Sequence, residues 1–108
     1  MKVAITLADS SLDSAVDERF GRAPYVALVD SATGKGQVVE NRHADDRSAG
    51  VKSAKTIVEM GADALISGDV GPNALSVLRA SGVKVYRARG GSGSDAVDAL
   101  LAGRLEKI

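Results

Sequence analysis

Arginines, one histidine and several glycine-rich turns are the parts of this sequence that could bind a ligand. The segment 16–25 (VDERFGRAPY) places Arg19 and Arg22 on either side of a glycine and holds the only phenylalanine, Phe20. Ordinary connecting loops are small and polar, so we expect Phe20 to anchor this segment in the core. Arg19 and Arg22 would then face a binding site, although the two acids before Arg19 could instead pair with it and shape the loop.

A second basic segment, 87–94 (RARGGSGS), combines Arg87, Arg89 and Gly91. Guanidinium groups and the backbone amides of such a loop suit an anion, and a flexible connection is the alternative interpretation. The spacing of its glycines differs from the dinucleotide-binding fingerprint, and the first expected strand is not followed by that fingerprint either. These observations argue against a nicotinamide or flavin enzyme.

His43 is the only histidine and lies in a polar segment, 41–49. Imidazole is the commonest metal ligand, whereas a lone loop histidine is often an exposed polar side chain. The chain contains no cysteine, which excludes disulfides, thiolate nucleophiles and thiolate ligands for zinc or iron–sulfur clusters. Any metal cluster would therefore be held by His43, by carboxylates or amides, or without covalent bonds to the protein.

The turn 67–74 (SGDVGPNA) joins an expected strand to an expected helix. Gly68 and Gly71 would let backbone amides approach a ligand, with Asn73 in the first helical turn. A tight structural turn explains the same residues equally well. No Gly-Lys-Ser/Thr follows, so the turn is not a Walker loop.

Catalytic arrangements are weakly represented in the sequence. Asp9 and Asp69 both follow expected strands, as in a two-metal nuclease, but such sites need several close carboxylates and no third acid is suitably placed. A hydrolytic triad lacks a serine in a nucleophile-elbow context. We therefore expect a binding protein rather than an enzyme.

Composition narrows the protein class further. The 108 residues suit a single domain, 1–108, and include 14 basic and 14 acidic side chains, so the net charge is zero. A neutral chain argues against nucleic-acid and anionic-membrane partners, which require a basic excess. No apolar run reaches the roughly 20 residues of a membrane span, and the first residues run directly into a strand pattern. We expect a cytoplasmic protein.

Apolar periodicity predicts five strands, at 2–8, 25–30, 37–40, 64–67 and 83–86. Helices follow the third, fourth and fifth strands; Ser94 is the expected N-cap of the last helix, and Leu101 is expected on its apolar face. Short turns make the first three strands an antiparallel meander, and helical crossovers make the later strands parallel. The prediction is an α/β fold with a five-stranded mixed sheet, strand order 3-2-1-4-5, antiparallel strand two and flanking helices.

This topology gathers four loops at one end of the sheet. Strands one, three, four and five run in the same direction, and open α/β sheets bind ligands at the carboxyl ends of their strands. Helix N-termini, which favour anions, point to the same end. The loops contain six arginines, which either line a basic concavity or are simply solvated: Arg19, Arg22, Arg42, Arg47, Arg87 and Arg89.

Four motifs, in this order, resemble the dinitrogenase iron-molybdenum cofactor biosynthesis family, which includes NifX-like carriers and the C-terminal domain of NifB. The segment 16–25 resembles the family signature, and 50–54 (GVKSA), 71–74 (GPNA) and 82–86 (GVKVY) are similar to its other landmarks. The resemblance spans essentially the whole chain. It implies a ribonuclease H-like three-layer fold without the nuclease acids.

The same resemblance implies a function, which is non-enzymatic binding or carriage of an iron–sulfur-type metallocluster or an iron-molybdenum cofactor precursor, as in nitrogen fixation. The cluster would be bound non-covalently, with a nitrogenase or a cluster-assembly protein as partner. Arginines and helix N-termini suit such an anionic cargo. The expected cofactor site contains Arg19, Phe20, Arg22, His43, Asn73, Arg87, Arg89 and Gly91, with His43 as the metal ligand.

Two other functions stay open at this point. A binding or regulatory module for a phosphorylated small molecule would use the same arginine-containing loops. A metal-dependent nuclease would use Asp9 and Asp69, and is the less favoured of the two because the third acid is missing.

Overall fold

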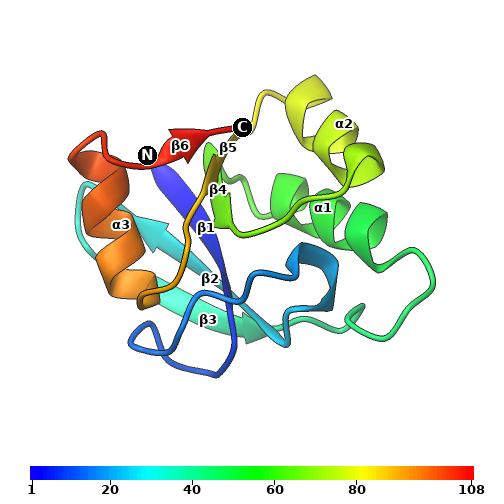
Figure 1. Cartoon of the computed structure of the whole chain (residues 1–108), viewed down its shortest axis with the longest axis horizontal. Coiled ribbons are helices and arrows are strands. Elements are labelled where there is room, and N and C mark those ends of the chain that lie inside the picture. Colours follow the sequence, from blue (N-terminus) through cyan, green and yellow to red (C-terminus); the bar gives the residue numbers. More distant parts are fainter.

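The computed structural model describes residues 1–108 and places one mixed β-sheet between two helical layers (Figure 1). The predicted α/β class and three-layer arrangement are therefore confirmed. The helices are α1 (Ala49–Glu59), α2 (Pro72–Ala80) and α3 (Gly93–Leu101), with a short 3-10 helix, η1 (Phe20–Arg22). The strands are β1 (Lys2–Leu7), β2 (Tyr25–Asp30), β3 (Gly36–Glu40), β4 (Ala64–Ser67), β5 (Lys84–Arg87) and β6 (Glu106–Lys107).

The sheet has the strand order β3-β2-β1-β4-β5-β6. β2 pairs antiparallel with β1 and β3, whereas β4 pairs parallel with both β1 and β5. The predicted order of the first five strands is confirmed, but the prediction of five strands is wrong. The sixth strand, β6, pairs Lys107 with Tyr86 and Glu106 with Arg87. Its two residues are charged and carry no apolar alternation, so only their pairing with β5 makes them a strand.

The alternation of side chains along β1 explains why helices cover both faces. Val3, Ile5 and Leu7 are fully buried in the cluster that includes the apolar residues of α3. Ala4 belongs to a second cluster, which includes the apolar residues of α1 and α2. Phe20 is 2% exposed in this second cluster, so its predicted role as an anchor is confirmed. Burying a side chain of this size contributes roughly 1.5–3 kcal/mol, which fixes the segment around it.

The start and end of α3 differ from the prediction. The N-cap is Ser92, whose Oγ accepts a hydrogen bond from the amide of Asp95 at 3.1 Å. Ser92 has the extended backbone that an N-cap requires, whereas Ser94 lies inside the helix and its Oγ donates to the carbonyl of Leu12. Leu101 is 56% exposed, so its predicted place on the apolar face is also wrong, because the helix ends at this residue.

Residues 8–22 fold back against the loops that follow β4 and β5 (Figure 1). The amide of Val16 donates to the carbonyl of Gly91 at 3.0 Å. The amide of Asp69 donates to the carbonyl of Glu18 at 2.6 Å, and the carbonyl of Asp69 accepts from the amide of Phe20 at 3.3 Å. The carboxyl ends of three strands are thus joined to one another by backbone hydrogen bonds.

η1 lies directly against the first turn of α1, and a glycine permits this contact. A Cβ on Gly21 would stand 2.5 Å from the amide nitrogen of Gly50 and 2.9 Å from the carbonyl carbon of Ala49. Side chains do not approach backbone atoms this closely, so any other residue at position 21 must displace η1 or α1. A Cβ on Gly50, in contrast, would meet only the Cβ of Ala74, at an ordinary 3.6 Å.

The chain ends lie away from residues 8–22. Figure 1 shows both termini at the opposite end of the sheet, beside β6. None of the three helices combines the length and the apolar character that a membrane crossing needs.

We expect Gly21→Ala to lower the free energy of unfolding by about 1–3 kcal/mol, because the added methyl group overlaps the backbone of α1. Gly50→Ala is the matched control on the other side of the same contact. It should leave stability unchanged or raise it by about 0.5–1 kcal/mol, because alanine favours a helix over glycine. Urea unfolding followed by circular dichroism measures both. Equal stability of the two variants would show that the packing of η1 against α1 does not require glycine at position 21.

Candidate functional site

Arg19 is held by the acid two residues before it. Its Nε and Nη2 donate to the two carboxylate oxygens of Asp17 at 3.1 and 2.9 Å, and its backbone amide donates to the same carboxylate. The side chain of Asp17 is 6% exposed and that of Arg19 is 69% exposed. Hydrogen bonds from Arg19 lower the pKa of Asp17 against the opposing effect of burial, and the same pair raises the pKa of Arg19. The local pairing that the sequence left open is the arrangement observed.

Asp17 also rests on a buried pair of hydroxyl groups. The Oγ1 of Thr6 donates to the carbonyl of Asp17 at 2.8 Å and lies 2.7 Å from the Oγ of Ser67. The amide of Asp17 donates back to the carbonyl of Thr6 at 2.9 Å. Since Thr6 and Ser67 are fully buried, this network fixes residues 8–22 to both β1 and β4.

Arg87 and Arg89 lie near acids rather than in a purely basic site. Nη1 of Arg87 is 3.3 Å and Nη2 of Arg89 is 4.0 Å from the carboxylate of Glu106 in β6. Both arginines line a small hollow of about 70 Å³ together with Glu18 and Asp69. The hollow is therefore lined by two acidic and two basic side chains. The carbonyl of Gly91 in the same loop accepts a hydrogen bond from residues 8–22, as described above.

Asn41 connects the segment that holds Phe20 to the loop that holds His43. Its Nδ2 donates to the carbonyls of Gly21 and Ala23 at 3.2 and 2.8 Å. Its Oδ1 accepts from the amide of His43 at 3.1 Å and from the Oγ of Ser53 in α1 at 3.4 Å. One amide side chain thus joins three parts of the chain, and the position of His43 depends on it.

His43 forms an oriented pair with a carboxylate. Its Nδ1 lies 2.8 Å from Oδ2 of Asp46, which also accepts from Nζ of Lys52 at 3.3 Å. The hydrogen bond from His43 and, to a smaller extent, the hydrogen bond from Lys52 lower the pKa of Asp46. This carboxylate is therefore ionised at neutral pH. A carboxylate on one imidazole nitrogen fixes the ring and leaves the other nitrogen, Nε2, for a ligand. The imidazole is 39% exposed, so a ligand can reach it.

Three further arginines belong to this part of the molecule. Nη1 of Arg22 donates to the carbonyl of Ala44 at 2.9 Å, which places one of the predicted site residues against the His43 loop. Arg42 and Arg47 lie in the loop itself, and neither forms an ion pair or a side-chain hydrogen bond within the chain. The loop therefore retains cationic groups that are free to bind an anion.

Asn73 lines a separate hollow of about 270 Å³ between the first turns of α1 and α2. Arg47 lines the same hollow. The N-cap positions of the two helices, Ser48 and Gly71, make no side-chain capping hydrogen bond. Backbone amides at both helix starts therefore remain without a side-chain partner, an arrangement that favours negative charge.

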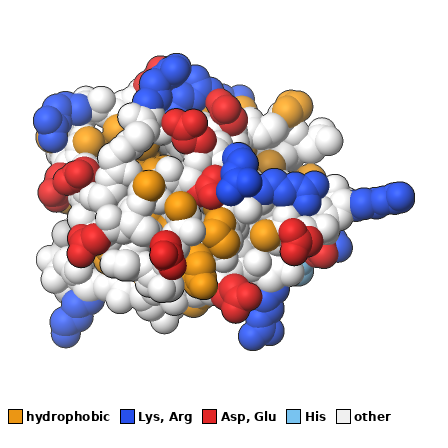
Figure 2. Space-filling model, turned by 60° about the horizontal axis from the view of Figure 1, so that its bottom comes forward, with side chains coloured by type: hydrophobic (Ala, Val, Ile, Leu, Met, Phe, Trp, Pro, Cys, Tyr) orange, Lys and Arg blue, Asp and Glu red, His pale blue; other side chains and the backbone are white.

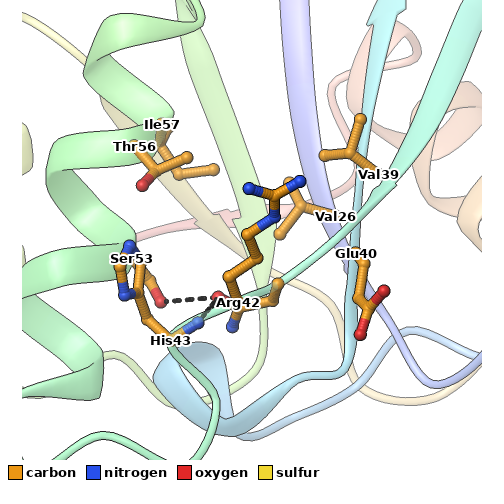
Figure 3. Close-up of a pocket in the computed structure, with 9 residues that line it drawn as sticks. Val26, Val39, Glu40, Arg42, His43, Ser53, Thr56 and Ile57 are labelled. Carbon is orange, nitrogen blue, oxygen red and sulfur yellow. Dashed lines mark hydrogen bonds between the residues drawn. The ribbon is translucent and has the colours of Figure 1, made fainter.

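A cavity of about 230 Å³ lies between β3 and α1 (Figure 3). Its apolar lining comes from Val26, Val39 and Ile57. His43 and Arg42 lie at its edge, together with Asn41, Glu40, Ser53 and Thr56. This is the cavity to which the sequence-predicted metal ligand, His43, belongs.

Charge of both signs covers the end of the molecule that carries residues 8–22. Figure 2 shows Lys, Arg, Asp and Glu side chains interspersed over this face. No group of three or more histidine, aspartate and glutamate side chains in residues 1–108 is arranged to hold a metal ion.

Residues 1–103 match the family model described as dinitrogenase iron-molybdenum cofactor. The chain belongs to this dinitrogenase iron-molybdenum cofactor family. The resemblance read from the four sequence motifs is therefore confirmed.

Relatives of this family member share its fold over nearly their whole length. A Thermotoga protein described as a candidate NifB protein is 43% identical, with a TM-score of 0.86 over 98% of this chain and 91% of its own. The apo form of the orange protein from Desulfovibrio gigas is 34% identical, with a TM-score of 0.93 over 99% and 92%. An uncharacterized protein of Methanocaldococcus jannaschii is 31% identical over 100% of this chain and 92% of its own.

The structure divides the predicted site of this family member into three places. His43 and Arg22 come together at the loop 41–48, Asn73 lies in the hollow between α1 and α2, and Arg87 and Arg89 lie beside β6. Sequence reasoning placed Arg42 and Arg47 among the arginines of the basic end but not in the expected cofactor site, and it did not single out Asn41 or Asp46. Their position in the same short polar segment as His43 was the available signal.

We expect Asp17→Asn to lower the free energy of unfolding by about 1.5–3 kcal/mol near neutral pH, because it removes the charged partner of Arg19. The pKa of Asp17 is lowered from 3.8 on folding, so the pairing stabilises the fold above this pH and is lost as pH falls through the lowered pKa. The difference between wild type and variant should therefore disappear in strong acid. Urea unfolding at several pH values measures it, with the exposed Asp98→Asn as control. A difference that persists in strong acid would contradict the assignment.

Proposed function

We propose that this protein is a non-enzymatic carrier of an anionic iron–sulfur-type metallocluster, such as an iron-molybdenum cofactor precursor. The observation that carries the proposal is the pairing of His43 Nδ1 with Asp46 Oδ2 at 2.8 Å. This carboxylate–imidazole arrangement is the one that metal-binding histidines use, and it leaves Nε2 as the ligand atom. Membership of the dinitrogenase iron-molybdenum cofactor family supports the choice of cargo.

One imidazole cannot hold a cluster alone, so the remaining attraction must be electrostatic. The chain has no cysteine, which leaves cationic side chains and backbone amides for this role. Arg22 and Lys52 contact the loop that holds His43, and Arg47 lies in this loop. Asn73 and the first turns of α1 and α2 line a hollow together with Arg47. Charge-assisted hydrogen bonds from such groups suit sulfide-rich anions. We propose that the cluster sits on the outer side of residues 41–48.

The other predicted site residues have different proposed roles. Phe20 and Arg19 act indirectly, since one anchors η1 and the other is paired with Asp17. Arg87 and Arg89 would have to give up their ion pairs with Glu106 before they could contact a cluster. Gly91 has the role of shaping the loop that holds these two arginines.

Relatives support the partner class that we propose. A Thermotoga relative is described as a candidate NifB protein, which supports a partner in cluster assembly. The Desulfovibrio gigas orange protein is described in an apo form, a term for a protein without its ligand, which supports a ligand-binding role. We propose a nitrogenase or cluster-assembly protein as the recipient. The ribonuclease H-like classification of the fold, a single domain over residues 1–108 and a cytoplasmic location remain predictions.

A phosphorylated small molecule is the second candidate cargo. The hollow between α1 and α2, with Arg47 and two uncapped helix starts, favours it. A thermal-shift screen with nucleotides and sugar phosphates separates the candidates, because the carrier proposal predicts no stabilisation by these compounds.

We expect anaerobic incubation with a synthetic iron–molybdenum–sulfur cluster to give a coloured protein that retains iron and molybdenum on gel filtration. His43→Ala should lower cluster affinity by more than about tenfold, and Asp46→Asn by about 10–100-fold, because the latter frees the imidazole to rotate. Visible absorption and metal analysis of the protein peak measure both effects.

Arg79→Gln is the control, since it removes an exposed positive charge from the last turn of α2, far from α2's first turn. It should bind as wild type does. Failure of iron to co-elute with the wild-type protein would remove the carrier proposal. Normal binding by His43→Ala would remove only the ligand role of His43.

A further inference from the structure

The cavity between β3 and α1 is a second place where a small molecule fits. Its volume of about 230 Å³ equals roughly eight water molecules at about 30 Å³ each. Val26, Val39 and Ile57 form its apolar lining (Figure 3). An apolar lining does not hold water well, so a ligand with an apolar part would gain free energy by entering.

A buried hydroxyl group at the cavity lacks a good partner. Ser53 is 3% exposed, and its Oγ has only one hydrogen bond, to Oδ1 of Asn41 at 3.4 Å. This distance is at the long limit for a hydroxyl donor, and the lone pairs of the oxygen accept nothing from the chain. Buried polar groups are normally satisfied, so Ser53 has remaining capacity to bind a polar ligand atom.

A guanidinium group without a carboxylate partner lies over the same cavity. Figure 3 shows the side chain of Arg42 extending between the strand side, at Val26, and the helix side, at Thr56. Arg42 forms no ion pair within the chain, although Glu40 also lines the cavity. An arginine presents parallel donors that match a carboxylate.

We propose that this cavity binds a small monocarboxylic acid with a short apolar chain, whose carboxylate pairs with Arg42 while its chain contacts Val26, Val39 and Ile57. The volume limits the ligand to roughly eight non-hydrogen atoms, by comparison with water. One guanidinium beside the negative charge of Glu40 suits a monoanion better than a doubly charged phosphate. The hydroxyl of Ser53 supplies a further hydrogen bond to the ligand.

The proposed acid site and the proposed cluster site share one residue, His43, which also lines the cavity. They differ in what recognises the ligand: Arg42 and the apolar lining for the carboxylic acid, and Nε2 of His43 with Arg22, Arg47 and Lys52 for the cluster. The experiment therefore uses metal-free protein, so that failure of one proposal leaves the other unaffected.

Hexanoate is the probe, because it has eight non-hydrogen atoms, and hexanol and inorganic phosphate are the comparison compounds. Titration followed by amide chemical shifts should show saturable changes at Val26, Val39 and Ile57 with hexanoate. Hexanol, which lacks the charge, should bind about tenfold more weakly. Phosphate should cause no saturable change at these three residues.

Arg42→Gln should weaken hexanoate binding about tenfold while leaving hexanol binding unchanged. Lys55→Gln removes one positive charge from an exposed position of α1 and should leave hexanoate affinity within about twofold. Glu40→Gln should strengthen hexanoate binding, since it removes a like charge. Absence of saturable shifts, equal binding of hexanol and hexanoate, tighter binding of phosphate, or equal losses in Arg42→Gln and Lys55→Gln would each overturn the proposal.

Discussion

Close backbone contact between residues 8–22 and the loops around them is the constraint on which this end of the molecule depends. A Cβ on Gly21 would overlap the backbone of α1, and a Cβ on Gly68 would overlap the Cα of Glu18. Contacts this close leave no room for a side chain or for a ligand between the segments. Packing of Phe20 supplies the apolar anchor, and the buried hydroxyls of Thr6 and Ser67 satisfy the polar groups beneath it.

The consequence for function is that the expected basic concavity is divided. Residues 8–22, which form the loop after β1, occupy the region where the loops after β4 and β5 would otherwise border a crevice. Arg19 is paired with Asp17, and Arg87 and Arg89 both lie near Glu106. The cationic groups that remain available to a ligand lie in the loop after β3, residues 41–48. Asn41 fixes this loop to η1 and α1, so the segment 16–25 positions His43 indirectly, through the backbone carbonyls of Gly21 and Ala23 and through Arg22, which donates to the carbonyl of Ala44.

The loop 41–48 therefore serves two surfaces. Its outer side carries the oriented imidazole of His43 with nearby cations, and its inner side, with Arg42, borders an apolar cavity. Arg42 on the inner side and Arg47 in the same loop form no ion pair or side-chain hydrogen bond within the chain, whereas His43 and Lys52 are paired with Asp46. A chain of zero net charge can therefore still present local cationic groups.

Apolar periodicity, the lengths of the connections and the motif 16–25 were enough to predict the order of the first five strands, the anchoring role of Phe20 and the family. Other features depend on contacts between distant parts of the chain. β6 exists because β5 offers an unpaired edge, and Ser92 rather than Ser94 caps α3 because its backbone alone is extended. Whether Arg19 pairs with Asp17, and whether Arg42 stays unpaired, depends on which acids the fold brings within reach. Charges interact over a few ångströms of space, so the fold decides which of several nearby acids pairs with a given arginine.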